Sequence, residues 1–336
     1  MLPFKVVYSD GYYLPIGDHI FPSDKYRRVC QRLTETGIAE TADFVIPEPA
    51  TDRDVLLVHG PEYVYKLQTG MLSAREELQM EVPYSEELVD AFWLQAGGSI
   101  LAGELALQQR VSINLGGGFH HAFPDHGEGF CMINDLAIAI RRLQRDNKIQ
   151  RALVVDCDVH QGNGTAVIFG YKRAAANPAD ALPSSPAPTI TRTQLGWLRE
   201  MPPAQDPDVF TISLHQENNY PVWKPPSDID VNLPDGLPDD PYIAWLDNAV
   251  SSALRRFQPQ LISYVAGADP YQYDQLGGLG LTIEGLKRRD LLVFRVAKTR
   301  GIPIMVTIAG GYAVDMDDTI EIHTNTVLAA KEVFGE

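Results

Sequence analysis

The sequence predicts an α/β protein in which an open, mostly parallel sheet has helices on both faces. Short, continuously apolar runs recur along the 336-residue chain and end in glycine or polar residues, which is typical of buried parallel strands. Longer stretches with helical periodicity lie between these runs, and such alternation indicates a parallel sheet covered by helices. Ligands bind such sheets beyond the carboxyl ends of the strands, where polar clusters occur in this chain.

In chain order, the expected elements alternate between helices and strands. The stretches with helical spacing are Ser85–Gln108, Asn134–Gln144 and Pro241–Phe257. The apolar runs expected to be strands are Arg110–Leu115, Ala152–Val155, Val209–Leu214, Leu261–Val265 and Ile302–Ile308. Each run leads directly into glycines, histidines or aspartates, so we expect one functional site at the edge where the strands end.

Composition and charge narrow the class of protein. The chain is 45% hydrophobic and 21% charged, as expected of a globular protein with a sizeable core. A net charge of −16 disfavours direct binding to nucleic acid, because phosphate backbones are repelled by acidic surfaces. Apolar runs such as Ile302–Ala309 are shorter than the ~20 residues of a membrane-spanning helix. Three sparse cysteines and an N-terminus unlike a secretion signal predict a cytoplasmic protein.

Residues 171–207 interrupt the alternation with a segment rich in proline, alanine and serine. Loops between strands and helices in α/β units have about 2–6 residues, so this segment is an insertion. We favour a solvated surface insertion. The alternative is a lid or partner-contact segment anchored by Trp197 and Leu198.

The run Asp156–His160 suggests a metal site. Side chains two residues apart on an extended chain point the same way, so Asp158 and His160 can converge. Asp269, after another predicted strand, is a third candidate ligand. The alternative is that these residues only cap strand ends. Two aspartates and one histidine suit a divalent cation with an open position, as in catalytic sites, and admit zinc, iron or cobalt.

Two further clusters suggest a reaction at that site. Gly116–Gly118 lets the backbone approach a ligand closely, and the adjacent His120 and His121 can serve as a proton-transfer pair. Tyr312, after two glycines at the end of a strand, can donate to an oxyanion. The alternative roles are structural: a buried histidine pair and a tyrosine packed at the edge of the core.

These motifs together resemble those of the zinc-dependent histone deacetylase superfamily, whose members share the arginase-deacetylase fold. The motifs occupy residues 116–135, 154–165, 212–221, 267–282 and 309–312, in that order. Residues 19–26 and 161–164 are most similar to bacterial members and the small class IV branch. The resemblance implies a three-layer fold with an eight-stranded sheet, and a single catalytic domain over residues 1–336 that carries 171–207 as a surface insertion.

The resemblance also implies roles for residues. The zinc ligands would be Asp158, His160 and Asp269. His121 would be the general base that takes a proton from water and later gives one to the leaving amine. His120, paired with Asp156, would be its electrostatic partner, and Tyr312 would donate its hydroxyl to the acyl oxygen. The acyl-lysine channel would be lined by Gly129, Phe130, Tyr220 and Leu276. A structural potassium ion would involve Asp156, Asp158, His160, Ser213 and Leu214.

The chain departs from the family pattern at informative positions. Asn163 stands where many members have the aspartate that partners the second histidine, so His121 would be held by a neutral hydrogen bond and be less basic; class IV-like members share this feature. Leu276 stands near the acidic gatekeeper of acetylpolyamine-selective members, which argues against polyamines as substrates. Glu81 is a candidate for the acidic residue at the rim that holds the substrate backbone.

The sequence therefore predicts a zinc-dependent hydrolase that removes acetyl or other acyl groups from lysine side chains of proteins or peptides. One alternative is a small-molecule amidase such as an acetylpolyamine deacetylase. Another is a binding protein that kept the pocket and lost turnover. The presence of all three candidate ligands, both histidines and Tyr312 argues against the latter.

Overall fold

The computed structural model describes residues 1–170 and 206–335. These residues contain an eight-stranded sheet in which all pairings are parallel and the strands follow the order β2-β1-β3-β8-β7-β4-β5-β6. The strands are β1 (Val6–Val7), β2 (Phe44–Val45), β3 (Val111–Asn114), β4 (Ala152–Asp156), β5 (Val209–Gln216), β6 (Ile229–Leu233), β7 (Leu261–Ala266) and β8 (Ile304–Ile308).

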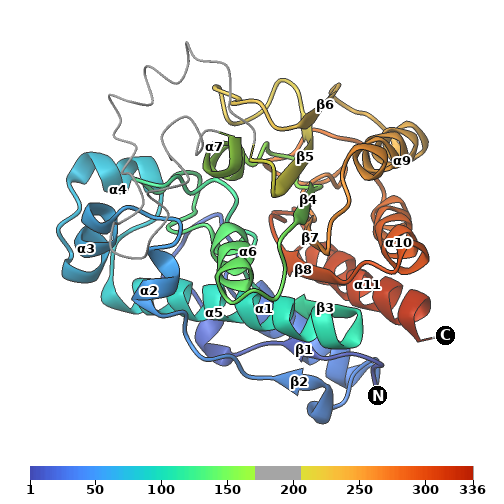
Figure 1. Ribbon diagram of the computed structural model, residues 1–336, viewed down its shortest axis with the longest axis horizontal. Helices are drawn as coiled ribbons and strands as arrows, with labels where there is room; N and C mark the ends of the chain where they lie inside the picture. The colour runs from blue at the N-terminus through green and yellow to red at the C-terminus, as the bar shows by residue number, and fades with distance from the viewer. Residues whose placement is uncertain (171–205, 336) are drawn as a thin grey trace.

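Helices cover both faces of this sheet (Figure 1). The helices are α1 (Lys25–Glu35), α2 (Asp52–Val55), α3 (Pro61–Thr69), α4 (Ala74–Met80), α5 (Glu86–Gln109), α6 (Asp135–Arg145), α7 (Asn163–Gly170), α9 (Asp239–Arg256), α10 (Ile283–Arg300) and α11 (Met316–Phe334). Helices α5, α6 and α7 lie along one face, and α1, α9, α10 and α11 lie along the other. The predicted fold class is confirmed, with a sheet that is entirely rather than mostly parallel.

Two of the three predicted helices begin where their sequences offer caps. The Ser85 side chain accepts a hydrogen bond from the backbone of Leu88 at the start of α5, and Asn134 does the same with Ala137 at the start of α6. Such bonds satisfy backbone amides that have no partner within the helix. Helix α9 begins at Asp239, two residues before the expected start.

The five predicted strands are present as β3, β4, β5, β7 and β8. Strands β1, β2 and β6 were not expected. The first two have only two residues each, too few to show a pattern of their own. Strand β6 lies at the edge of the sheet and is mostly half-buried, so it lacks the continuous apolar run of a central strand.

The order of the central strands brings three chain segments together at the carboxyl ends of those strands. Strand β7 pairs with β4 and with β8, so Asp156 lies beside Val265, and Ala266 lies beside Ile308. The loops that follow these strands therefore leave the sheet side by side. All of these strand residues are buried.

Two sequence-based expectations concern the rest of the chain. The predicted insertion at 171–207, including Trp197 and Leu198, lies outside the described residues except for Asp206 and Pro207. Among the helices of residues 1–170 and 206–335, none combines the length and the apolar character needed to cross a membrane.

Candidate active site

A cavity of about 220 Å³ opens at the edge of the sheet where the central strands end. Its walls include these predicted site residues: His120, His121, Gly129, Phe130, Asp158, His160, Tyr220, Leu276 and Tyr312. Asp156, Asn163 and Asp269 lie behind the wall, each within 3.3 Å of a histidine that lines it. Residues from distant parts of the chain thus converge on one space.

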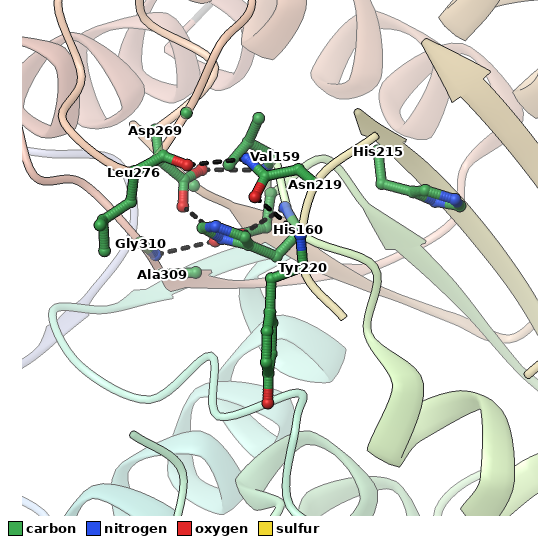
Figure 2. Close-up of polar contacts among 12 residues, drawn as sticks. Val159, His160, His215, Asn219, Tyr220, Asp269, Leu276, Ala309 and Gly310 are labelled. Carbon is green, nitrogen blue, oxygen red and sulfur yellow. Dashed lines mark hydrogen bonds and ion pairs between the residues drawn. The ribbon is translucent and has the colours of Figure 1, made fainter. Parts of the chain in front are cut away.

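Asp158, His160 and Asp269 form a buried group that we call the ligand cluster. One ligand atom from each lies within 4.8 Å of the other two. Nδ1 of His160 lies 3.1 Å from Oδ1 of Asp158 and 3.3 Å from Oδ2 of Asp269. Figure 2 shows His160 and Asp269 pointing toward each other. The aspartate and histidine after β4 therefore meet the aspartate after β7, as the strand pairing requires.

The remaining carboxylate oxygens of the ligand cluster are held by the backbone. The amide of Gly310 donates to Oδ2 of Asp158, and the amide of Val159 donates to Oδ1 of Asp269, both at 2.9 Å (Figure 2). A side chain at position 310 would not fit, because a Cβ there would lie 1.9 Å from Oδ2 of Asp269. These contacts fix both carboxylates and turn one oxygen of each toward His160.

The ligand cluster fits a divalent cation. Oδ2 of Asp269 is buried and accepts no hydrogen bond, which is costly for a carboxylate oxygen unless a charge compensates it. Burial and the nearby carboxylate of Asp158 raise the pKa of Asp269 to about 7, as expected when like charges share a site. Two carboxylates and one imidazole are suitable ligands for zinc, iron or cobalt.

The paired histidines differ in their surroundings. Nδ1 of His120 lies 2.7 Å from Oδ2 of Asp156. Burial alone would lower the pKa of His120, but the carboxylates of Asp156 and Asp158 raise it to about 9. Nδ1 of His121 lies 2.7 Å from Oδ1 of Asn163, and burial together with the neighbouring histidines keeps the pKa of His121 well below its usual value. A cationic and a neutral imidazole thus lie with ring centroids 4.1 Å apart, an arrangement typical of divided acid and base roles.

Tyr312 lies on the loop between β8 and α11. Its backbone amide donates to Oδ2 of Asp274 at 2.6 Å, and its ring lies 6.1 Å from the rings of Phe21 and Phe130. Burial and the acidic groups nearby raise the pKa of Tyr312 well above its usual value. The hydroxyl therefore stays protonated and can act as a hydrogen-bond donor.

The predicted channel residues form a narrow, largely apolar wall. Gly129 has φ +55°, and a Cβ there would lie 2.7 Å from Cδ2 of His121, so only glycine fits. The ring of Tyr220 lies edge-on to His121, with centroids 5.0 Å apart, and Leu276 lies across the ligand cluster from it (Figure 2). This wall can exclude water from a side chain that enters the cavity.

The comparisons with known proteins identify the family. Residues 19–327 match the family described as the histone deacetylase domain. The chain belongs to the histone deacetylase family. The resemblance predicted from the motifs is confirmed, and the family consists of hydrolases that are typically metal-dependent.

Three relatives illustrate this membership. The chain is 36% identical over 332 residues to an uncharacterized protein of Picosynechococcus, covering 98% of this chain and 99% of that one. It is 31% identical to histone deacetylase 2 of Arabidopsis thaliana, covering 92% of this chain and 74% of the relative. It is 26% identical to a histone deacetylase-like amidohydrolase of Pseudomonas aeruginosa, covering 89% and 76%.

A solved structure supports the fold of this family member. The crystal structure of the HDA15 HD domain matches with a TM-score of 0.72, covers 99% of this chain and 88% of that chain, and is 22% identical to this chain. At this identity the match bears on the fold alone. It agrees with the three-layer architecture described above.

Two of the predicted potassium ligands, Ser213 and Leu214, lie on β5, the strand that pairs with β4. Ser213 on β5 pairs with Asp156 on β4, and Ser213 and Leu214 are both buried. The hydroxyl of Ser213 lies 2.9 Å from Nδ1 of His215, a side chain that points away from the ligand cluster (Figure 2). The proximity of Ser213 to Asp156 matches the expected grouping. The potassium site itself stays a prediction.

Several residues at the cavity of this histone deacetylase family member were not singled out from the sequence. They are Phe21 and Asn219 in the wall and Glu128 behind it. The side-chain oxygen of Asn219 accepts a hydrogen bond from the backbone amide of Tyr220 at 2.7 Å, which positions Tyr220. The side-chain nitrogen of Asn219 donates to the carbonyl of Leu276 at 2.7 Å. Glu81, the rim candidate, does line the cavity. The position of Asn219 and Glu128 beside predicted channel residues was the available signal.

Proposed function

We propose that this protein is a zinc-dependent hydrolase that removes acetyl or other acyl groups from lysine side chains of proteins or peptides. The observation that carries the proposal is the meeting of the ligand cluster, a neutral His121 and a protonated Tyr312 around one cavity. Membership of the histone deacetylase family supports the same reaction class.

Asp158, His160 and Asp269 would hold the zinc ion. When bound, a divalent ion supplies Lewis acidity toward water and toward the acyl carbonyl. The buried oxygen of Asp269 that accepts no hydrogen bond supports this assignment. Iron or cobalt would suit the same ligands, and their availability in the cell would decide between them.

The protein's own groups would handle the protons. Asn163 accepts from Nδ1 of His121, which leaves Nε2 of His121 free to take the proton of the attacking water and later give it to the leaving amine. His120, cationic beside Asp156, would stabilise the negative charge that develops. Tyr312 would donate its hydroxyl to the oxyanion.

The channel would select for a neutral side chain. Gly129, Phe130, Tyr220 and Leu276 line the cavity. Burying an ammonium group among such residues costs free energy that a neutral acyl amide avoids. An acylated lysine would therefore enter where free lysine would not.

We propose that potassium binds beside the ligand cluster as a structural ion. Its ligands would be Asp156, Asp158, His160, Ser213 and Leu214, mostly through backbone oxygens. The pairing of Asp156 with Ser213 on adjacent strands supports this grouping. The ion would act by holding the end of β4, directly before the proposed zinc ligands Asp158 and His160.

The experiment is a turnover assay on lysine peptides carrying acetyl, lactyl, octanoyl or myristoyl groups, with acetylputrescine in parallel and metal content determined. Hydroxamate-sensitive hydrolysis of a peptide is the expected result and would identify the acyl group. No turnover of any peptide by metal-loaded protein would contradict the proposal.

A second candidate, hydrolysis of acylated polyamines, is favoured by Glu81, an acidic residue that lines the cavity and would attract a second ammonium group. Leu276, which also lines the cavity, favours the peptide instead. Preference for acetylputrescine over all peptides would establish this second candidate.

A further inference from the structure

Glu128 is an acidic residue behind the cavity wall that the proposed mechanism does not use. Its side chain is 19% exposed. Oε1 accepts hydrogen bonds from Nδ2 of Asn163 at 2.6 Å and from the hydroxyl of Tyr220 at 3.0 Å. Oε2 accepts from Nε2 of Gln79 at 3.3 Å and lies 3.5 Å from Nε2 of His126. Glu128 thus contacts the partner of His121 and a channel residue with the same oxygen.

The backbone holds Glu128 in this position. Its amide donates to the carbonyl of Cys131 at 3.0 Å, and the amide of Cys131 donates back to its carbonyl at 2.9 Å. The intervening Gly129 and Phe130 have φ +55° and +66°, a left-handed turn that projects Phe130 into the cavity wall. The turn that places a channel residue on one side therefore places a carboxylate on the other.

The hydrogen bonds form a chain from Glu128 to His121. An ionised carboxylate only accepts, so the amino group of Asn163 must face Glu128 and its carbonyl must face Nδ1 of His121. The amide of Gly164, which donates to the same carbonyl at 3.0 Å, favours the same orientation. Nδ1 of His121 then carries the hydrogen, and Nε2 keeps its lone pair for the substrate.

Glu128 keeps its negative charge in this setting. Burial alone would raise the pKa of Glu128, but hydrogen bonds from His126, Asn163 and Tyr220 bring it below its usual value. Hydrogen bonds to an ionised group are stronger than neutral ones, and bonds in a chain polarise one another. A carboxylate on the far side of Asn163 can therefore strengthen the hydrogen bond that Nδ1 of His121 donates to Asn163.

We propose that Glu128 is a positioning residue whose carboxylate acts on His121 through the amide of Asn163 and holds Tyr220 against the same ring. The inference rests on the proposed hydrolysis. It means that His121, whose direct partner is the neutral Asn163, has a carboxylate on the far side of that partner.

The test begins with Glu128→Gln, which keeps the shape and an oxygen facing Asn163 and Tyr220 but removes the charge. The expected result is a kcat lower by about 10–100-fold, the range typical of hydrogen-bond partners behind metal-ligating groups, with KM changed by less than about threefold and metal content unchanged. Glu128→Asp keeps the charge on a shorter side chain, so its kcat should lie between those of the parent and of Glu128→Gln. Glu62→Gln, the same exchange at a 72% exposed position, should match the parent.

A second variant moves the carboxylate. In Glu128→Gln/Asn163→Asp, the charge lies directly against His121 and the new glutamine can donate to it. Asn163→Asp alone leaves two carboxylates where 2.6 Å now separates an amide and a carboxylate, and should lose activity. The double variant should recover most of the kcat lost by each single one, because coupled residues give non-additive effects.

A readout without turnover follows the hydrogen bond itself. The proton resonance of Nδ1 of His121, recorded on the full chain, should move upfield in Glu128→Gln and return in the double variant. A kcat within about twofold of the parent in Glu128→Gln, an unmoved resonance, or no recovery in the double variant would overturn the proposal. If the parent itself hydrolyses no substrate, the proposed function fails, while the resonance still tests the contact from Glu128 to His121.

Discussion

The ligand cluster and the ion pair of Arg289 with Asp290 are both buried charged groups near the ends of β4 and β7, yet their charges are met differently. Arg289 and Asp290 are fully buried, and Nη2 of Arg289 lies 2.9 Å from Oδ1 of Asp290. The oxygens of Asp290 also accept hydrogen bonds from the hydroxyls of Tyr264 and Thr326. The charge of Asp290 is therefore matched within the protein.

The charges of the ligand cluster are matched only in part, because the single imidazole of His160 lies between two carboxylates. Asp158 and Asp269 carry like charges, and Oδ2 of Asp269 accepts no hydrogen bond. Since a buried charge is costly unless it is paired, a fold keeps such an arrangement where a ligand completes it. The ion pair supports this arrangement directly, because Nη1 of Arg289 donates to the carbonyls of Cys157 and Gly267, next to the strand ends that carry the ligands.

The largest expected effect is that of Asp269→Ala. Loss of one of the three proposed ligands should remove the metal and reduce turnover below detection, as measured by metal analysis and peptide assay. In metal-free protein, the conservative Asp269→Asn should melt at the same or a higher temperature than the parent, because one of two like charges is gone. Asp240→Asn, at an 84% exposed position, is the control. Full metal occupancy in Asp269→Ala would show that Asp269 is not a metal ligand.

The matched ion pair predicts the opposite behaviour for Arg289→Met. The variant leaves Asp290 buried without its cation, which should lower the free energy of unfolding by about 3–5 kcal/mol, as measured by urea denaturation of metal-free protein. Arg288→Met, at a 43% exposed position one residue earlier, should change it by about 0.5 kcal/mol or less. Arg289→Met/Asp290→Leu should recover much of the loss. If Arg289→Met were as stable as the parent, the buried charge of Asp290 would not depend on its pairing with Arg289.

Tyr312→Phe should separate activity from stability. Removing the proposed oxyanion donor should lower kcat by at least about 10²-fold, while the metal content and the melting temperature stay at the parent values. The ring contacts with Phe21 and Phe130 are retained in this variant. Unaltered turnover would show that Tyr312 has no part in the reaction.

His323 on α11 gives the smallest effect and a pH dependence. Burial, followed by the positive charges of Lys25 and Arg289, keeps the pKa of His323 well below its usual value of about 6.5. The unfolded chain therefore binds a proton that the folded chain does not, and stability is lost as the pH falls below about 6.5. His323→Leu should remove up to about 1.4 kcal/mol per pH unit of that loss, as measured by denaturation at pH 5 to 7. A slope equal to that of the parent would show that His323 is not the group responsible.

Much of the fold and of the candidate site could be predicted because the signals are local. Strand β4 is a continuous apolar run, and Asp158 and His160 follow it directly, in the bend after the strand ends. Ser85 and Asn134 mark the starts of their helices by a cap within three residues. Strands β1 and β2 carry no such signal, because two residues cannot show periodicity.

The sequence by itself determined which residues form the central strands, where α5 and α6 begin, and which side chains could bind a metal or move a proton. Only the tertiary structure decided that β7 lies between β4 and β8 and so brings Asp269 to His160. It also decided the opposite charge states of His120 and His121 and the contact of Glu128 with Asn163. The physical reason is that strand order, burial and hydrogen bonding between distant segments depend on the packing of the whole chain, which no local pattern records.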